Sequence, residues 1–142
     1  MTGHSTLTGH NAEPLITRFL QTTQAPIHAY NEEAAANKVL FHRHGKALLK
    51  RIAEDLGYRK DSYDLRSNMA GIAVSGEITL HTDDLYIQFS CSAFGSDLQI
   101  MYRRCQHRRD YTGLRNHFLP FQALCDYNKV LSAFQTVRAS AC

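Results

Sequence analysis

Residues 72–105, IAVSGEITLHTDDLYIQFSCSAFGSDLQIMYRRC, carry the clearest structural pattern of the chain. Apolar and polar residues alternate with a period of two, typical of a half-buried strand, in three runs: 72–81, 85–93 and 98–103. The turn formers Thr82-Asp83-Asp84 and Gly95-Ser96-Asp97 separate these runs. Connections this short join antiparallel neighbours, so the stretch predicts a three-stranded antiparallel meander with one apolar face that needs cover.

The longest helical pattern spans about residues 32–56, with Asn31 as a suitable N-cap and Gly57 as a typical stop. Apolar residues recur on one side at spacings of three and four: Phe41, Gly45, Leu48, Leu49, Ile52 and Leu56. This side is expected to cover the meander. The opposite side gathers four basic residues, Arg43, Lys46, Lys50 and Arg51. That basic side is either a solvated surface or a site for phosphate or carboxylate.

The N-terminal flank has a weaker pattern. Residues 1–12 are small and polar, which predicts a flexible tail. A short amphipathic helix is then expected to begin near Glu13-Pro14 and to stop before Pro26. Its apolar residues either pack on the domain or form a recognition helix that orders on a partner.

Residues 58–70 mix charges with turn formers and are expected to be a surface connection. The last segment, 119–137, predicts one or two helices with a break near 126–128. The fold class is therefore α+β, a single domain over 13–140 in which a long helix packs on the three-stranded meander and a C-terminal helix follows, in the order α-β-β-β-α. A double-stranded-RNA-binding domain has the same order and is an alternative fold, although topology does not fix function.

The composition is that of an ordinary globular chain. The 142 residues carry a net charge of +3, which is less basic than most nucleic-acid-binding domains. No apolar run approaches the roughly 20 residues that span a bilayer, and the first 30 residues lack the pattern of a signal peptide. We therefore expect a cytoplasmic protein without membrane contact, whose four widely spaced cysteines are free thiols.

Residues 103–117, RRCQHRRDYTGLRNH, contain five arginines. Guanidinium groups form forked hydrogen bonds with carboxylate and phosphate, and a tyrosine adds stacking or a hydroxyl. The candidate partner contacts are Arg104, Arg108, Arg109, Tyr111 and Arg115, with Arg43 and Lys50 as secondary candidates. Alternatively, some arginines pair with nearby acids and fix the loop. If Arg103 and Arg104 belong to a strand, they point to opposite faces.

No catalytic signature accompanies these residues. The sequence contains no phosphate loop, nucleophile elbow or paired-carboxylate motif. Cys105, His107 and His117 are suitable zinc ligands, and His81 could approach them from the first strand, but their spacing is not that of a known zinc motif. We therefore predict no catalytic residue, no metal site and no cofactor, and a role in binding rather than catalysis.

Three segments resemble a known group of proteins: SYDLRSNMAGIAVSGEITLHTDDLYIQFS at 62–90, YR at 102–103 and RRDYTG at 108–113. They resemble small uncharacterised proteins of proteobacterial plasmids, integrative elements and prophages, over about residues 40–120. No catalytic residue carries over from that group. The resemblance implies a setting, the bacterial cytoplasm during transfer or infection, where such small proteins act on host or defence machinery.

The leading hypothesis is a non-enzymatic accessory protein of a mobile element that binds and inhibits a host defence complex, of the anti-CRISPR or anti-restriction type. An arginine-dense segment could grip an acidic protein patch or compete for nucleic-acid backbone. The alternative is a nucleic-acid-binding module in which the basic helix side and residues 103–117 form one surface, with steeply salt-dependent affinity. A small nuclease is the third hypothesis.

Overall fold

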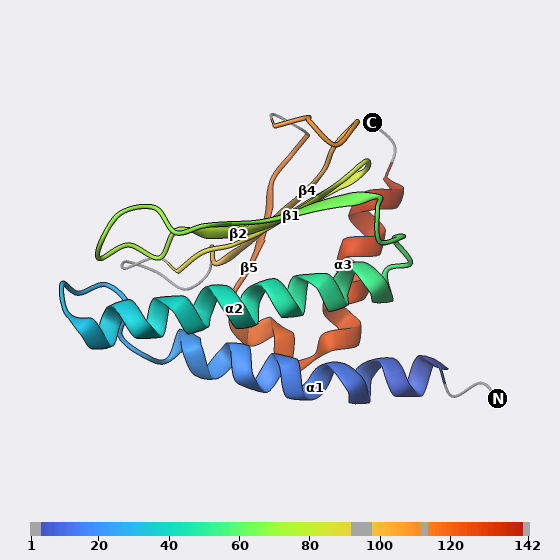
Figure 1. Ribbon diagram of the computed structural model, residues 1–142. Helices are drawn as coiled ribbons and strands as arrows, with labels where there is room; N and C mark the ends of the chain where they lie inside the picture. The colour runs from blue at the N-terminus through green and yellow to red at the C-terminus, as the bar shows by residue number, and fades with distance from the viewer. Residues whose placement is uncertain (1–3, 92–97, 112–113, 141–142) are drawn as a thin grey trace.

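The computed structural model describes residues 4–91, 98–111 and 114–140, with side chains from Ala12 onward. An antiparallel sheet forms one layer and the helices form a second layer on one of its faces (Figure 1). The elements are α1 (His4–Thr23), α2 (Glu32–Asp55), β1 (Tyr63–Asn68), β2 (Glu77–Thr82), β3 (Leu85–Phe89), β4 (Ile100–Arg104), β5 (His117–Leu119), the 3-10 helix η1 (Phe121–Cys125) and α3 (Tyr127–Ala139). The α+β class is confirmed. The order α-β-β-β-α fits only in part, because two helices precede a sheet of five strands, and this order also departs from that of a double-stranded-RNA-binding domain.

The strands lie in sequence order, β1-β2-β3-β4-β5, and every neighbouring pair is antiparallel. The three predicted strands correspond to β2, β3 and β4, each shorter than its run of alternating residues. In β3 the predicted apolar face is correct, since Leu85, Ile87 and Phe89 are fully buried. The turn predicted at 95–97 lies outside the described residues.

The edges of the sheet correct two predictions. The sequence predicts a surface connection over 58–70, but residues 63–68 form the strand β1. This strand lies at the sheet edge and is half exposed, so most of its residues are polar and its sequence resembles that of a loop. The sequence also predicts a strand from Ile72, whereas Ile72 and Val74 are 71% and 45% exposed in the β1–β2 loop. Ala70 and Ala73 in this loop have positive φ angles of 54° and 65°, which a strand cannot accommodate.

Helix α2 follows its predicted signals. The Asn31 side chain accepts a hydrogen bond of 2.8 Å from a backbone N–H of the first turn, and Gly57 has a φ of +86° just beyond the helix. All six residues of the predicted stripe are buried, including Gly45. A Cβ at Gly45 would lie 2.3 Å from Cδ1 of Ile78 in β2, so the missing side chain allows α2 to approach the sheet closely.

Helix α1 is longer than the sequence predicts. It begins at His4, not near Glu13-Pro14, so residues 4–12 of the predicted tail are helical and Pro14 lies inside the helix. The sequence left two roles open for the apolar side of this helix. Ile16 and Phe19 are buried in the common core, which confirms the packing role.

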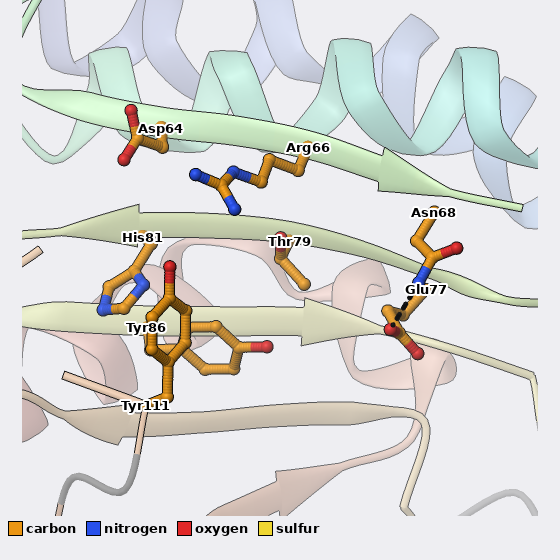
Figure 2. Close-up of a pocket in the computed structure, with 8 residues that line it drawn as sticks. All are labelled: Asp64, Arg66, Asn68, Glu77, Thr79, His81, Tyr86 and Tyr111. Atoms are coloured by element: carbon orange, nitrogen blue, oxygen red, sulfur yellow. Dashed lines mark hydrogen bonds between the residues drawn. The ribbon is translucent and has the colours of Figure 1, made fainter. Parts of the chain in front are cut away.

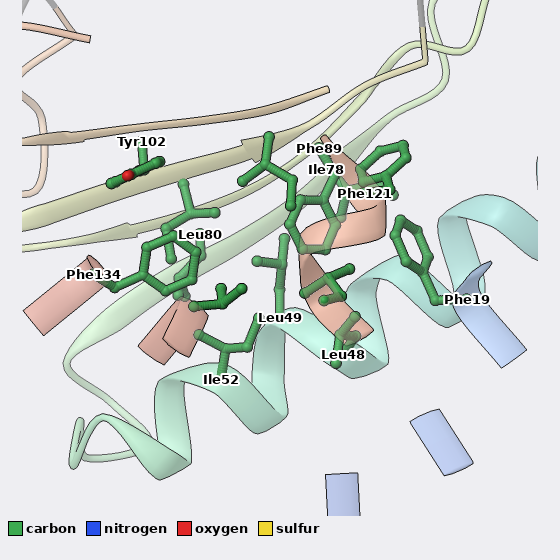
Figure 3. Packing of buried hydrophobic residues seen from close by; sticks show 14 of the residues in the cluster. Phe19, Leu48, Leu49, Ile52, Ile78, Leu80, Phe89, Tyr102, Phe121 and Phe134 are labelled. Atoms are coloured by element: carbon green, nitrogen blue, oxygen red, sulfur yellow. The ribbon is translucent and has the colours of Figure 1, made fainter. Parts of the chain in front are cut away.

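Aromatic rings join the helices to the sheet (Figure 3). The ring centroid of Phe19 lies 5.4 Å from that of Phe41 in α2 and 5.0 Å from that of Phe89 in β3. Phe121 of η1 meets the Phe19 ring edge-on at 4.9 Å. Aromatic pairs at these separations stabilise a core beyond their buried area. Phe19 is thus the residue through which α1, α2, the sheet and η1 are packed together.

The C-terminal segment has its predicted break. The Asp126 side chain accepts a hydrogen bond from the backbone N–H of Lys129 and caps α3 after η1. At the other end of α3, Arg138 donates to the carbonyl of Leu56 at 2.7 Å and lies 4.2 Å above the Tyr58 ring. These contacts attach α3 to the end of α2.

Replacing Gly76 with alanine should lower the free energy of unfolding by about 1–3 kcal/mol, the usual cost of a strained backbone position. Gly76 has a φ of +67°, and a Cβ there would lie 2.0 Å from the carbonyl oxygen of Asn68. Gly71 in the same loop is the matched control, because nothing lies within 4 Å of a Cβ built on it. Urea unfolding measures both variants, and equal effects of Gly76→Ala and Gly71→Ala would contradict this prediction.

Candidate binding surfaces

One face of the sheet carries no helix among the residues that the structure describes (Figure 1). Residues directly opposed in antiparallel strands share a face and form rows across it. One row on this uncovered face contains Asp64, His81, Tyr86 and Arg103. The next contains Arg66, Thr79, Gln88, Met101 and Phe118. The uncovered face is therefore charged toward β1 and more apolar toward β5.

Arg103 and Arg104 point to opposite faces of β4, as predicted. Arg103 is 5% exposed and its guanidinium carbon lies 4.2 Å above the centre of the Tyr86 ring on the uncovered face. Arg104 points toward the helices and donates a hydrogen bond to the backbone carbonyl of Arg138. Arg104, a candidate contact in the sequence, therefore links β4 to α3.

Arg108, also a candidate, anchors the connection between β4 and β5. Its guanidinium lies 3.6 Å from the Asp64 carboxylate and donates to the carbonyl of Asp61 at 3.2 Å. The Asp110 carboxylate accepts a 3.0 Å hydrogen bond from the loop backbone, and the N–H of Leu114 donates to a β4 carbonyl at 3.2 Å. Part of the arginine-rich segment thus fixes the loop, which is the alternative that the sequence left open.

Other side chains of this connection face solvent. Arg109 and Arg115 are exposed, and Tyr111, Leu114 and Phe118 are 60%, 38% and 44% exposed. We call these five residues the β4–β5 surface. It combines aromatic and guanidinium groups, which are enriched at protein interfaces, with the aliphatic side chain of Leu114. Phe118 belongs to β5, and the other four residues lie on the loop held by the anchors described above.

The secondary candidates Arg43 and Lys50 lie elsewhere. Both are exposed on α2, in the helix layer, whereas the β4–β5 connection lies on the other side of the sheet (Figure 1). Arg51 of the same basic side forms an ion pair of 3.0 Å with Asp55. The single basic surface on which the nucleic-acid hypothesis depends is therefore divided between two sides of the molecule.

A hollow of about 260 Å³ opens on the uncovered face, over β1, β2 and β3 (Figure 2). We call it the β1–β3 hollow. Its lining residues are Asp64, Arg66, Asn68, Glu77, Thr79, His81, Tyr86 and Tyr111. Seven of them come from the rows of the sheet, and the Tyr111 side chain reaches the hollow from the β4–β5 connection. The sequence singles out His81 and Tyr111 of this set, but it does not identify Asp64, Arg66 and Asn68 as site residues, because it does not predict β1 as a strand.

His81 lies at the base of this hollow and is only 4% exposed. The Tyr86 and Tyr111 rings meet its ring edge-on, at 5.1 Å and 5.2 Å. Burial, and then the positive charge of Arg103, lowers the pKa of His81, although Asp64 opposes this effect. The ring is therefore neutral at physiological pH.

The possible zinc ligands are not brought together. His117 points to the helix side of the sheet and stacks on Tyr102 at 5.3 Å. Cys105 is buried, its thiol lies 3.3 Å from the carbonyl of Thr82, and burial raises its pKa to about 11. Within the ranges that the structure describes, no group of three or more His, Cys, Asp or Glu side chains could hold a metal ion.

Stability should fall as the pH drops below 6.5, the ordinary pKa of histidine. Burial lowers the pKa of both His42 and His81. The His42 ring is hydrogen-bonded to the Ser67 hydroxyl and to the backbone carbonyl of Ser75, and the charges of Lys38 and Glu77 act on it in opposite directions. The unfolded chain therefore takes up protons at a higher pH than the folded chain does. The stability from the neutral rings is complete above pH 6.5 and is lost as the pH falls to their folded pKa values.

The melting temperature across this range measures the effect. Wild type should lose more stability on acidification than His81→Phe, which removes one of the histidines whose pKa is lowered in the folded state. An identical pH dependence for the two proteins would show that His81 does not contribute.

By architecture, the chain is a two-layer α+β protein in which no described helix covers one face of the sheet. Comparisons with protein-family models, curated proteins and solved structures gave no match. None of the helices in the described ranges combines the length and apolar character needed to cross a bilayer.

Proposed function

We propose that this protein is a non-enzymatic binding protein that recognises a partner protein through the β4–β5 surface. The observation that carries the proposal is the exposure of Tyr111, Leu114 and Phe118 together with two exposed arginines on an anchored loop. Aromatic residues and arginine dominate the energetics of protein interfaces. Anchoring reduces the conformational entropy that the loop loses on binding.

A protein partner fits this surface better than a nucleic-acid backbone does. A polyanion needs several unpaired cations on one surface. Here Arg104 and Arg108 make contacts within the fold, and the exposed cations Arg43 and Lys50 lie on the other side of the sheet. The exposed apolar side chains of the β4–β5 surface would add little to phosphate contacts, but they suit a protein interface.

The resemblance to proteins of mobile elements supplies the class of partner that we propose, a subunit of a bacterial host defence complex. By binding such a subunit, the protein would inhibit restriction or CRISPR interference in the bacterial cytoplasm. This part of the proposal concerns the setting and rests on the resemblance, whereas the binding surface rests on the exposure of Arg109, Tyr111, Leu114, Arg115 and Phe118.

Two measurements in a bacterial host with an active defence system test the proposal. Affinity purification of the tagged protein should recover a defence subunit, and its expression should raise the survival of an incoming phage or plasmid. Purified partner and protein should then bind in a salt-tolerant manner, unlike a phosphate backbone. Unchanged survival, together with recovery of no partner or only of nucleic acid, would contradict the proposal.

A further inference from the structure

The β1–β3 hollow contains a buried acceptor that lacks a donor. Nε2 of His81 has no hydrogen-bond partner among the described residues, although the residue is only 4% exposed. The backbone of His107 acts on the ring in the direction that raises the pKa of His81, which is the effect of a carbonyl beside a ring N–H. A neutral imidazole has one donor and one acceptor nitrogen, and from the position of the His107 backbone we infer that the unpaired Nε2 is the acceptor. An acceptor left unpaired in such a place is costly and calls for a ligand donor.

Arg66 offers donors to the same hollow. Its side chain extends from β1 across the hollow toward Asp64 and His81 (Figure 2). It makes no hydrogen bond or ion pair with any residue that the structure describes, and the hydroxyl of Thr79 opposite it makes none either. A ligand in this hollow could thus donate to His81 and accept from Arg66 at the same time.

The charges around the hollow nearly cancel. The Asp64 carboxylate lies 3.6 Å from the Arg108 guanidinium, and the Glu77 carboxylate accepts a 3.3 Å hydrogen bond from Asn68. The charge of Arg66 balances that of Glu77, and the effects of Arg103 and Asp110 on His81 oppose each other. An inserted anion would meet two carboxylates and an inserted cation would meet two guanidinium groups, so the hollow favours an uncharged polar group.

The walls favour a flat group. The Tyr86 and Tyr111 rings border the hollow, and Tyr111 is 60% exposed (Figure 2). Exposed side chains change rotamer within nanoseconds. The Tyr111 ring can therefore leave its edge-on contact with the His81 ring and stack on a ligand. The volume of about 260 Å³ lies just below the range of roughly 300–1,000 Å³ for drug-sized ligands, which suits one ring system.

We propose that the β1–β3 hollow binds a nucleobase, an uncharged flat heterocycle that carries an N–H donor beside an acceptor. The donor pairs with Nε2 of His81, the acceptor pairs with the Arg66 guanidinium, and the ring stacks on Tyr111. Free nucleotides and single-stranded nucleic acid both supply this group. The two hydrogen-bonding residues, Arg66 of β1 and His81 of β2, lie outside the β4–β5 surface, whereas Tyr111 belongs to both sites. Arg66→Gln and His81→Phe therefore test the base site without changing the proposed protein-binding surface.

Nitrogen-15-labelled protein titrated with the four ribonucleoside monophosphates tests the site by NMR. Amide shifts in β1 and β2 should saturate with at least one nucleotide and not with ribose 5-phosphate, which lacks the base. Arg66→Gln and His81→Phe should each weaken binding about tenfold, the effect of losing one buried hydrogen bond. Arg43→Gln removes the same charge from α2 and should leave the affinity unchanged.

A short single-stranded oligonucleotide distinguishes the two sources of the base. If the oligonucleotide binds more tightly than any mononucleotide and Arg66→Gln loses this binding, the natural ligand is nucleic acid. If the two affinities are equal, the natural ligand is a free nucleotide. Saturation by ribose 5-phosphate, an equal loss in Arg43→Gln, or no shifts at millimolar nucleotide would overturn the proposal. Arg66 is exposed, so Arg66→Gln keeps the test decisive even if His81→Phe does not fold.

Discussion

Replacing Phe19 with alanine is expected to lower the free energy of unfolding by about 3–5 kcal/mol, the usual cost of removing a buried phenylalanine. The Phe19 ring is fully buried and lies within 5.4 Å of the rings of Phe41, Phe89 and Phe121. Its loss leaves a cavity between α1, α2 and the sheet that these large neighbours cannot fill. Chemical unfolding followed by circular dichroism measures the change.

Phe118 provides the matched control. It is the same residue type, but it is 44% exposed on β5, so Phe118→Ala should change stability by about 0.5 kcal/mol or less. A loss of less than about 1 kcal/mol in Phe19→Ala would mean that α1 is not part of the cooperative core, and that its apolar side has the recognition role instead.

The sequence predicts the centre of the sheet well and its edges poorly. Leu85, Ile87 and Phe89 alternate with polar residues because only one face of β3 is buried, and this alternation is visible in the sequence. β1 is an edge strand, so Tyr63 and Leu65 are only half-buried and polar residues surround them. The short β5 pairs only with β4 and has too few residues to show a period. The sequence therefore predicts neither edge strand.

The candidate sites show the same limit. The sequence shows the density of arginines in 103–117. Whether an arginine is exposed, however, depends on contacts distant in sequence, such as that of Arg104 with Arg138 and that of Arg108 with Asp61. The β1–β3 hollow depends on the pairing of Asp64 with His81 across β1 and β2. A search of the sequence for a segment that could pair in register with β2 is the way to predict β1, and with it the hollow.

Reversing the charges of the β4–β5 surface should have the largest effect on the proposed binding. Arg109→Glu/Arg115→Glu is expected to weaken the affinity for the partner protein by roughly 30- to 1,000-fold, because each interface arginine contributes about 1–2 kcal/mol and tenfold corresponds to 1.4 kcal/mol. Both residues are exposed, so the fold should be unaffected. Arg108 is unsuitable for this test, since its reversal would disturb the contacts with Asp61 and Asp64 that anchor the loop.

The most direct measurement compares two matched variants for capture of the partner from the bacterial host. Arg109→Glu/Arg115→Glu changes the β4–β5 surface, and Arg43→Glu/Lys50→Glu makes the same change in charge on α2, on the other side of the sheet. We predict that quantitative mass spectrometry will find the defence subunit with wild type and with the α2 variant, and not with the β4–β5 variant. Retention of the subunit by the β4–β5 variant, or its loss from the α2 variant alone, would contradict the account.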